Sequence, residues 1–285
     1  MRIPKCSQSG MTIIELLVAS VAFLLLSTAI LGITVVSQRV LVEQDRLAAS
    51  EQETRGALLI MSNSTLLAGC GIPAQLDDPA STGLNAAFTN ATATAVTFRG
   101  CFSDPTVRTS LTATTTLAAT GTAVLSVDSV AGFTVGNRIY VYSIKRWAYG
   151  PLTAVNAGAS TLTVNFATVP VLPSEFTAGS LIFREEIMGF AYDTTTGSLR
   201  RAVAIPPAVA VPVDLVGNVT NLQLTYWDSS GTQLTTFPLS LADRRAVHGV
   251  GIDITVETER PNPKTNEMLT VRLNTAVQPR NLFAN

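Results

Sequence analysis

The stretch SGMTIIELLVAS, residues 9–20, begins a long apolar run and places one acid, Glu15, near its start. Residues 16–36, LLVASVAFLLLSTAILGITVV, carry no charge. As a helix this run would be about 32 Å long at about 1.5 Å per residue, which matches a bilayer hydrocarbon core of about 30 Å. Because Arg2 and Lys5 precede the run, the positive-inside rule predicts a cytoplasmic N-terminus and an exported remainder.

The apolar run could be a cleaved secretory signal or a membrane anchor, and the presence of Glu15 helps to distinguish them. A cleaved secretory signal would use the small residues at 27–29, but the apolar run continues to Val36 and has an acid at its front. A plain membrane anchor explains the length and leaves the acid unexplained. A carboxylate costs about 2.5 kcal/mol or more at the bilayer centre, and less toward the interface. The Glu15 carboxylate therefore requires either a neutralising partner or a functional explanation.

The N-terminus resembles that of the type IV pilin class, which has a short basic leader ending in glycine, here MRIPKCSQSG, before MTIIELLVAS and a long apolar helix. The resemblance implies that prepilin peptidase removes residues 1–10 by cutting between Gly10 and Met11, and that the new amine is methylated. Residues 11–36 then form the transmembrane and assembly helix. The resemblance also implies that the Glu15 carboxylate pairs with the N-terminal amine of a neighbouring subunit, which would neutralise a buried charge.

The following segment, residues 37–68, is an amphipathic continuation of this helix, with apolar residues roughly at helical spacing and most charges on other faces. Gly69, Gly71 and Pro73 are typical of a helix end. We expect one helix, bent or interrupted, from about residue 12 to 68. Gly32, where many major pilins have a proline, either loosens the helix or allows close packing.

From residue 84 onward, stretches rich in Thr and Val alternate with Gly, Asn, Pro and Asp, which predicts β-structure. The expected fold class is α+β: a long N-terminal helix packed on an antiparallel β-sheet head. We expect residues 69–102 and 182–285 to form the head and residues 103–181 to form an inserted β-module. Within the head, NLQLTYWD-SSG-TQLTTF predicts a hairpin with its turn near Ser230 and Gly231.

Motifs further along resemble the PilW-like minor pilins, which are related to the J-type minor pseudopilin of type II secretion. They are RGALLIMSNSTLLAGCGIP at the helix end and, in order, MGFAYDTTTGSLRR, LVGNVTNLQLTYWDSSGT, VGIDITVETE and LTVRLNTAVQPRNL. The resemblance omits residues 103–181. That module either contacts a partner or enlarges the head.

The chain has three cysteines, Cys6, Cys70 and Cys101. Removal of the leader would take Cys6 away and leave Cys70 and Cys101 as one candidate disulfide outside the cytoplasm. Two separate buried thiols are the alternative.

Residues suited to catalysis or metal binding are few. His248 is the single histidine, and no CxxC, HExxH, phosphate loop or GxSxG motif occurs. The acidic pairs at 77–78 and 185–186 lack the spacing of a calcium loop, which favours solvated charge or a turn. Trp147 and Tyr149, in KRWAYG, suggest either a surface contact or ordinary strand residues. We expect no enzyme activity, no metal and no cofactor.

The function that these patterns indicate is structural. We expect a minor type IV pilin that primes or joins pilus assembly, held in the bacterial inner membrane with its head in the periplasm before it enters a pilus or pseudopilus. Its partners would be prepilin peptidase, other minor and major pilins, the inner-membrane assembly platform and membrane lipid. A net charge of −1 does not indicate a basic surface for binding nucleic acid, so we expect no nucleic-acid partner. The alternatives are a minor pseudopilin of type II secretion and a membrane-anchored adhesin or binding module.

Overall fold

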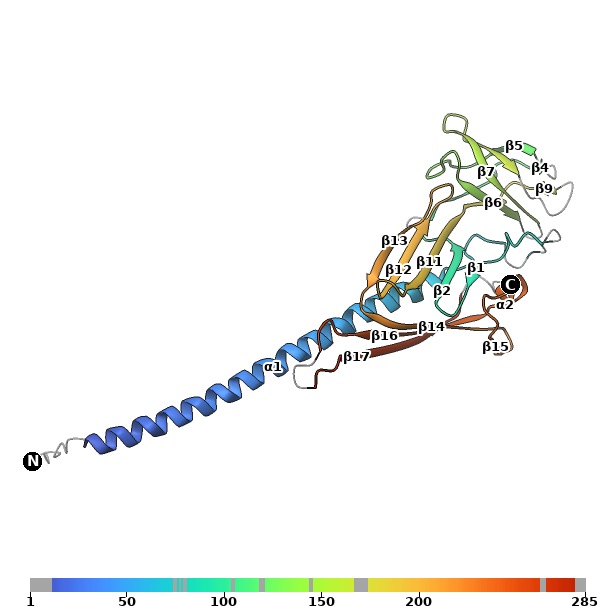
Figure 1. Ribbon diagram of the computed structural model, residues 1–285. Helices are drawn as coiled ribbons and strands as arrows, with labels where there is room; N and C mark the ends of the chain where they lie inside the picture. The colour runs from blue at the N-terminus through green and yellow to red at the C-terminus, as the bar shows by residue number, and fades with distance from the viewer. Residues whose placement is uncertain are drawn as a thin grey trace, which may run out of the picture. The chain divides into compact units, whose positions relative to one another are not determined.

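A computed structural model of the chain describes residues 12–73, 76, 78, 81–103, 106–117, 121–143, 146–166, 174–261 and 265–279. The chain divides into two compact units, Met1–Ala49 and Ser50–Asn285. Gly10, Met11 and Cys6 lie outside the described residues. The fold class is α+β, with a long N-terminal helix and antiparallel sheets, as the sequence predicts (Figure 1).

The helix α1 (Ile13–Leu66) is continuous over 54 residues and passes through Gly32 without a break. It ends where the chain turns into left-handed backbone at Gly69 and Gly71. At Gly71, where φ is +71°, a Cβ would lie 2.7 Å from the ring of Phe183. This position therefore requires glycine for both its backbone conformation and its close packing.

In the first unit, the apolar side chains of α1 are exposed along the whole uncharged run; Leu16, Leu25 and Ile33 are 63%, 68% and 68% exposed. The hydroxyls in this run donate to helix carbonyls one turn back, for example from Thr28 to Leu24 at 2.7 Å. By length and composition, α1 is the helix among the described residues that can cross a membrane. An apolar surface that nothing in its own chain covers requires lipid or another protein around it.

The second unit contains antiparallel sheets. A five-stranded sheet has the order β1 (Phe88–Ala91), β2 (Ala95–Gly100), β11 (Glu186–Asp193), β12 (Ser198–Ala204) and β13 (Val211–Val216). A four-stranded sheet has the order β15 (Gln233–Leu234), β14 (Val219–Trp227), β16 (Gly249–Glu257) and β17 (Thr270–Val277). The short helix α2 (Leu241–Ala246) begins at Ser240, whose hydroxyl accepts from the amide of Asp243.

A six-stranded sheet has the order β3 (Arg108–Ser110), β10 (Leu181–Arg184), β6 (Arg138–Ser143), β7 (Arg146–Asn156), β8 (Thr161–Phe166) and β5 (Gly121–Ser126). A bridge between Leu111 and Val127 joins its two ends, so the sheet closes on itself as a small barrel. The pair β4 (Thr115–Leu117) and β9 (Ser174–Phe176) lies beside it. Whether this segment is an insertion relative to other proteins stays a prediction.

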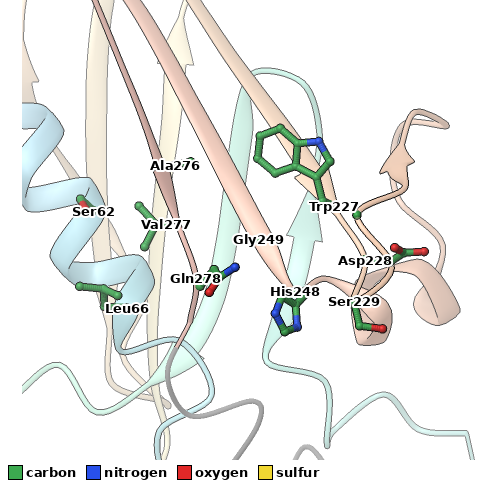
Figure 2. A pocket seen from close by; sticks show the side chains of 11 residues that line it. Ser62, Leu66, Trp227, Asp228, Ser229, His248, Gly249, Ala276, Val277 and Gln278 are labelled. Carbon is green, nitrogen blue, oxygen red and sulfur yellow. The ribbon is translucent and has the colours of Figure 1, made fainter.

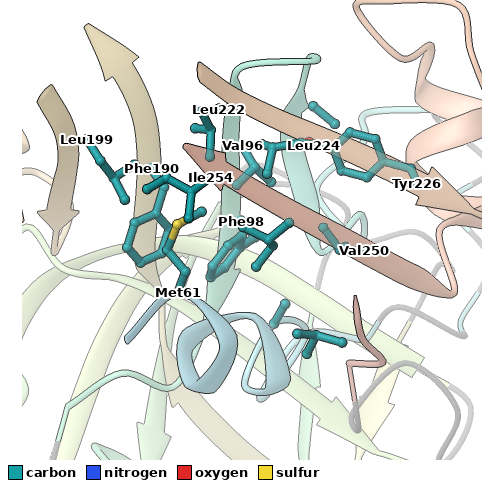
Figure 3. Close-up of a cluster of buried hydrophobic side chains, with 14 of the residues drawn as sticks. Met61, Val96, Phe98, Phe190, Leu199, Leu222, Leu224, Tyr226, Val250 and Ile254 are labelled. Atoms are coloured by element: carbon teal, nitrogen blue, oxygen red, sulfur yellow. The ribbon is translucent and has the colours of Figure 1, made fainter. Parts of the chain in front are cut away.

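Two separate cores follow from this arrangement. In the first, Ala57 and Met61 of α1 pack with the inner faces of the five-stranded and four-stranded sheets, including Phe98, Phe190 and Ile254 (Figure 3). The barrel has its own core, which includes Leu125, Ile139, Leu162 and Phe176. The predicted hairpin is present between β14 and β15, with Gly231 in left-handed backbone at its turn.

Candidate functional site

The start of α1 holds the acid singled out in the sequence. The Thr12 amide donates to Glu15 Oε2 at 2.9 Å, and the Thr12 hydroxyl donates to the same oxygen at 3.1 Å. In return the Glu15 amide donates to Thr12 Oγ1 at 3.3 Å. These reciprocal bonds form a capping box, in which Thr at the N-cap and Glu three residues later satisfy helix-end amides.

The capping box gives Glu15 a partner within its own chain, and the sequence interpretation missed it. The signal was present, because T-x-x-E before an apolar run is the sequence signature of such a cap. The structure also places the carboxylate at the helix N-terminus, where the helix dipole favours negative charge. Pairing of Glu15 with a neighbouring subunit, and cleavage between Gly10 and Met11, stay predictions.

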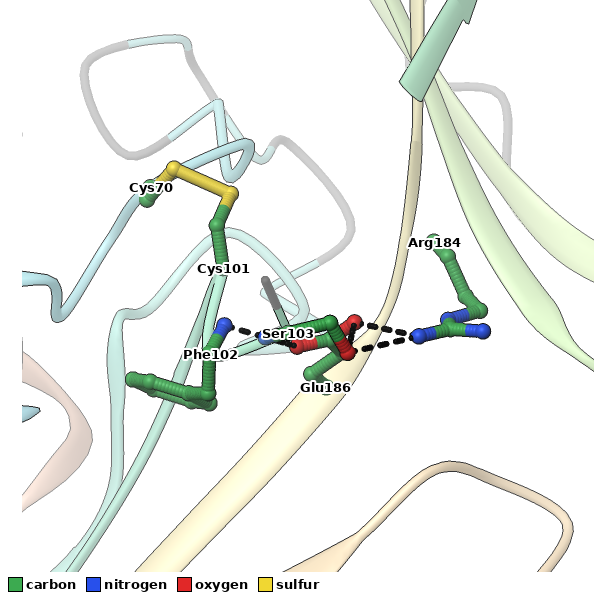
Figure 4. The surroundings of a disulfide bond; sticks show 6 residues. All are labelled: Cys70, Cys101, Phe102, Ser103, Arg184 and Glu186. Carbon is green, nitrogen blue, oxygen red and sulfur yellow. Dashed lines mark hydrogen bonds and ion pairs between the residues drawn. A yellow bond between two sulfur atoms is a disulfide. The ribbon is translucent and has the colours of Figure 1, made fainter. Parts of the chain in front are cut away.

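The end of α1 is joined covalently to the five-stranded sheet. Cys70 and Cys101 form a disulfide with a Cα–Cα distance of 5.2 Å (Figure 4). Beside it, the amide of Gly69 donates to the carbonyl of Arg99 at 2.8 Å, and Ala68 bridges to Gly100. The segment that follows α1 and the C-terminal end of β2 are therefore held together by both a disulfide and backbone hydrogen bonding.

Removing this disulfide is expected to lower the free energy of unfolding by about 3–4 kcal/mol, the chain-entropy cost of opening a loop of this size. The paired cysteines are 31 residues apart. Denaturant unfolding of the wild type with and without reductant measures the loss. A variant with both Cys70→Ser and Cys101→Ser is the control, since it should unfold like the reduced wild type and ignore the reductant. Equal stability of oxidised and reduced wild type would contradict the prediction.

The acidic pair Glu185-Glu186 marks the joint between the barrel and the five-stranded sheet, since it lies where β10 ends and β11 begins. The sequence interpretation as solvated charge or a turn is wrong, because these two residues are 1% and 2% exposed. Glu185 accepts from Arg99 Nε at 2.7 Å and from the Tyr149 hydroxyl at 2.8 Å. It therefore connects a strand of the head to a strand of the barrel.

Glu186 is held by two residues that follow β2 and by Arg184 at the end of β10 (Figure 4). Its Oε2 accepts from the amides of Phe102 and Ser103, both at 2.7 Å. Its Oε1 accepts from the Ser103 hydroxyl and from Arg184 Nη2, both at 2.6 Å. Burial alone would raise the pKa of this carboxyl, but the hydrogen bonds from Ser103, Arg184 and Phe102 outweigh it and hold the pKa below its ordinary value.

This lowered pKa predicts a loss of stability in acid. A carboxyl whose folded-state pKa lies below its unfolded-state value stabilises the fold above the unfolded pKa, and this contribution is lost as the pH falls through the folded pKa. The melting temperature of the wild type should therefore fall more steeply between about pH 5 and pH 3 than that of a Glu186→Gln variant. Parallel pH profiles for the two proteins would count against it.

The aromatic pair in KRWAYG is not a surface contact. Trp147 is 1% exposed and Tyr149 is 5% exposed, and both pack with Tyr140 and Ile72 in a third small cluster. The rings of Tyr140 and Tyr149 lie with centroids 4.8 Å apart. Of the two sequence interpretations, ordinary strand residues is therefore the one confirmed, because Trp147 and Tyr149 of β7 fill the space between the barrel and the chain that follows α1.

His248 lines an open pocket with Trp227, Asp228 and Gln278 (Figure 2). The carboxylate of Asp228 is occupied within its own turn, where Oδ1 accepts from the amides of Ser230 and Thr232 at 2.8 and 2.9 Å. This oxygen of Asp228 therefore serves the turn between β14 and β15. No group of three or more His, Cys, Asp or Glu side chains gathers as a metal site in the part of the chain that the structure describes.

Neither the models of known protein families nor the curated proteins give a match to this sequence. Among solved structures, the chain is similar in part to a type IV-like pilin from Thermus thermophilus, with 12% identity and a TM-score of 0.28. The matched region covers 52% of this chain and 85% of that pilin. A likeness of this extent assigns neither family nor function, so the chain's own residues must support both.

Proposed function

We propose that this protein is a type IV pilin-like subunit, and specifically a minor pilin that primes or joins pilus assembly. The observation that carries the proposal is the N-terminal half of α1. It is an uncharged helical run, long enough to cross a bilayer, with none of its most apolar stretch covered by its own chain. A single carboxylate, Glu15, stands at its start in a capping box with Thr12.

Each part of this segment has a role in the membrane insertion, processing and assembly of a pilin-like subunit. The helix first holds the chain in the inner membrane, with its N-terminus in the cytoplasm and its head in the periplasm. Prepilin peptidase removes residues 1–10 and the assembly platform extracts the subunit. The apolar helix then exchanges lipid for the helices of other minor and major pilins. An anchor or adhesin would need a helix of this length, but it would need neither Gly10 nor Glu15.

Mass spectrometry of the N-terminal peptide, on protein from its native envelope, tests the proposal. The expected chain begins at methylated Met11. A Gly10→Leu variant should keep its leader, because a bulky residue at the cleavage position blocks the peptidase, while a conservative Ser9→Ala variant should mature normally. A chain that begins at Met1 would make the protein a plain anchored one, and a chain that begins at Ile30 would make it a secreted one. Either result would overturn the proposal.

A further inference from the structure

The disulfide between Cys70 and Cys101 lies where the chain leaves the five-stranded sheet for the barrel (Figure 4). β2 ends one residue before Cys101, and Phe102 and Ser103 follow it outside the strands. The amides of both residues donate to Glu186 Oε2 at 2.7 Å. The backbone that holds this buried carboxylate therefore begins directly at one end of the disulfide.

The other end of the disulfide begins a second contact with the barrel. Gly71 lies so close to the ring of Phe183 on β10 that a Cβ at Gly71 would be 2.7 Å from it. Ile72 is 7% exposed and packs in one cluster with Trp147 of β7. Because these two residues directly follow Cys70, the disulfide joins the two segments that contact the barrel at this point.

The barrel and the sheets beside it have separate cores. Leu125 and Phe176 belong to the barrel core, whereas Phe98 and Ile254 belong to the core under the other two sheets. The contacts between them are hydrogen bonds, ion pairs and the small cluster around Trp147. A change in the orientation of the barrel therefore need not disturb either core, which is the property of a hinge between two packed bodies.

Two contacts of the barrel do not run through the disulfide. Glu185 accepts from Arg99 Nε on β2 at 2.7 Å. Asn137, in the turn before β6, donates from Nδ2 to the carbonyl of Pro206, in the loop between β12 and β13, at 3.2 Å. These bonds would remain after reduction of the disulfide, so reduction is expected to loosen the barrel and not to detach it.

We propose that the disulfide is a redox-sensitive lock on the barrel. The oxidised chain holds the barrel in one orientation, and the reduced chain lets residues 71–72 and 102–103 part, so that the barrel moves on its remaining contacts. The physical reason is entropy: an unanchored segment must be ordered before its amides can hold Glu186, and this ordering opposes the contact. The lock goes beyond the proposed function and does not depend on it, because its residues all lie in the second unit, Ser50–Asn285.

Closing the lock is a thiol–disulfide exchange. The thiolate of one cysteine attacks a disulfide oxidant to form a mixed disulfide, and the thiolate of the other cysteine displaces the oxidant from it. The cysteine pair loses two electrons and two protons, and the oxidant leaves as two thiols. A dithiol reductant reverses these steps. Cys101 is 6% exposed and Cys70 is half-buried, so Cys70 is the more open to exchange.

The two tryptophans of the chain test the lock separately. Trp147 lies at the contact between the barrel and Ile72, whereas Trp227 is on β14 of the four-stranded sheet. Trp227→Phe and Trp147→Phe each leave one tryptophan, since the chain has two. Full-length chains with Cys6→Ser, in detergent, are quenched with acrylamide before and after dithiothreitol. Reduction should raise the quenching constant of Trp147 about threefold or more through local opening, and leave that of Trp227 and the far-UV circular dichroism unchanged.

Glu186→Gln distinguishes a lock from general stabilisation by a cross-link. With Trp147 as the single tryptophan, the oxidised Glu186→Gln chain should already be quenched more than the chain with Glu186. Reduction should then add less, because the disulfide acts in part through the same amides. Asp253→Asn is the matched control. It breaks an ion pair with Arg272 between β16 and β17 and should leave the full response of Trp147 to reduction.

Three results would overturn the lock. Equal quenching of Trp147 in oxidised and reduced chains would show that the remaining contacts fix the barrel unaided. Increased quenching of both tryptophans with loss of circular dichroism would show that the second unit unfolds as a whole, which would make the disulfide a general stabiliser. A full response in the Glu186→Gln chain would show that the disulfide does not act through Glu186.

Discussion

Replacing Glu15 by alanine is expected to leave the leader removed and the chain in the membrane, but to keep the subunit out of the filament. On the proposed function, processing would depend on Gly10 and insertion on the apolar run, so neither would need the carboxylate. Assembly would place the start of α1 among other helices, where the new N-terminal amine of a neighbour would otherwise be a buried charge without a partner. Breaking a buried ion pair by removing one member costs about 3–5 kcal/mol, enough to reduce incorporation by more than a hundredfold.

The capping box supplies a matched control for this experiment. Thr12→Val removes the hydroxyl that bonds Glu15 but keeps the carboxylate. If Glu15 serves assembly, the Thr12→Val subunit should still enter filaments while the Glu15→Ala subunit does not. Immunoblots of sheared filaments against membrane fractions measure both. If the two variants fail equally, the cap and not the charge pairing is the role of Glu15, and wild-type incorporation of Glu15→Ala would exclude both roles.

Replacing Arg99 by methionine is expected to destabilise the second unit by about 3–5 kcal/mol, because it leaves Glu185 buried without its counter-charge. Arg99 also donates from Nη1 to the carbonyls of Gly83 and Ala86, both at 3.1 Å. Methionine keeps most of the packing of the side chain while it removes the charge and these donors. Unfolding in denaturant, followed by circular dichroism, measures the loss.

The controls for Arg99 separate buried charge from charge in general. Arg200, which pairs with Asp193 and Asp214 at the surface, should tolerate the same substitution with a much smaller loss, because exposed ion pairs contribute little. A double variant, Arg99→Met with Glu185→Gln, should recover part of the lost stability because no charge is left buried. Equal losses at Arg99 and Arg200 would contradict the joint as described.

The parts of this protein that follow from neighbouring residues could be predicted before the fold was known. The apolar run, the amphipathic continuation and the glycines after residue 68 predict α1 nearly to its ends, because helix contacts reach only three or four residues along the chain. The strand-rich remainder and the hairpin around Gly231 follow from local alternation and turn residues in the same way. The capping bond between Thr12 and Glu15 could also have been predicted from sequence, because the two residues are only three positions apart.

Only the folded chain shows why Glu185 and Glu186 are buried, because their partners Arg99 and Phe102 lie 86 and 84 residues away in sequence. Closure of the barrel through Leu111 and Val127 is likewise a product of strand order that no local pattern encodes. The exposure of Val211 and Val213 on β13 is another case, since they are 73% and 61% exposed. Alternation along β13 shows which residues share a face, but whether that face is covered depends on where α1 and the second sheet end, and that is set by packing between distant segments.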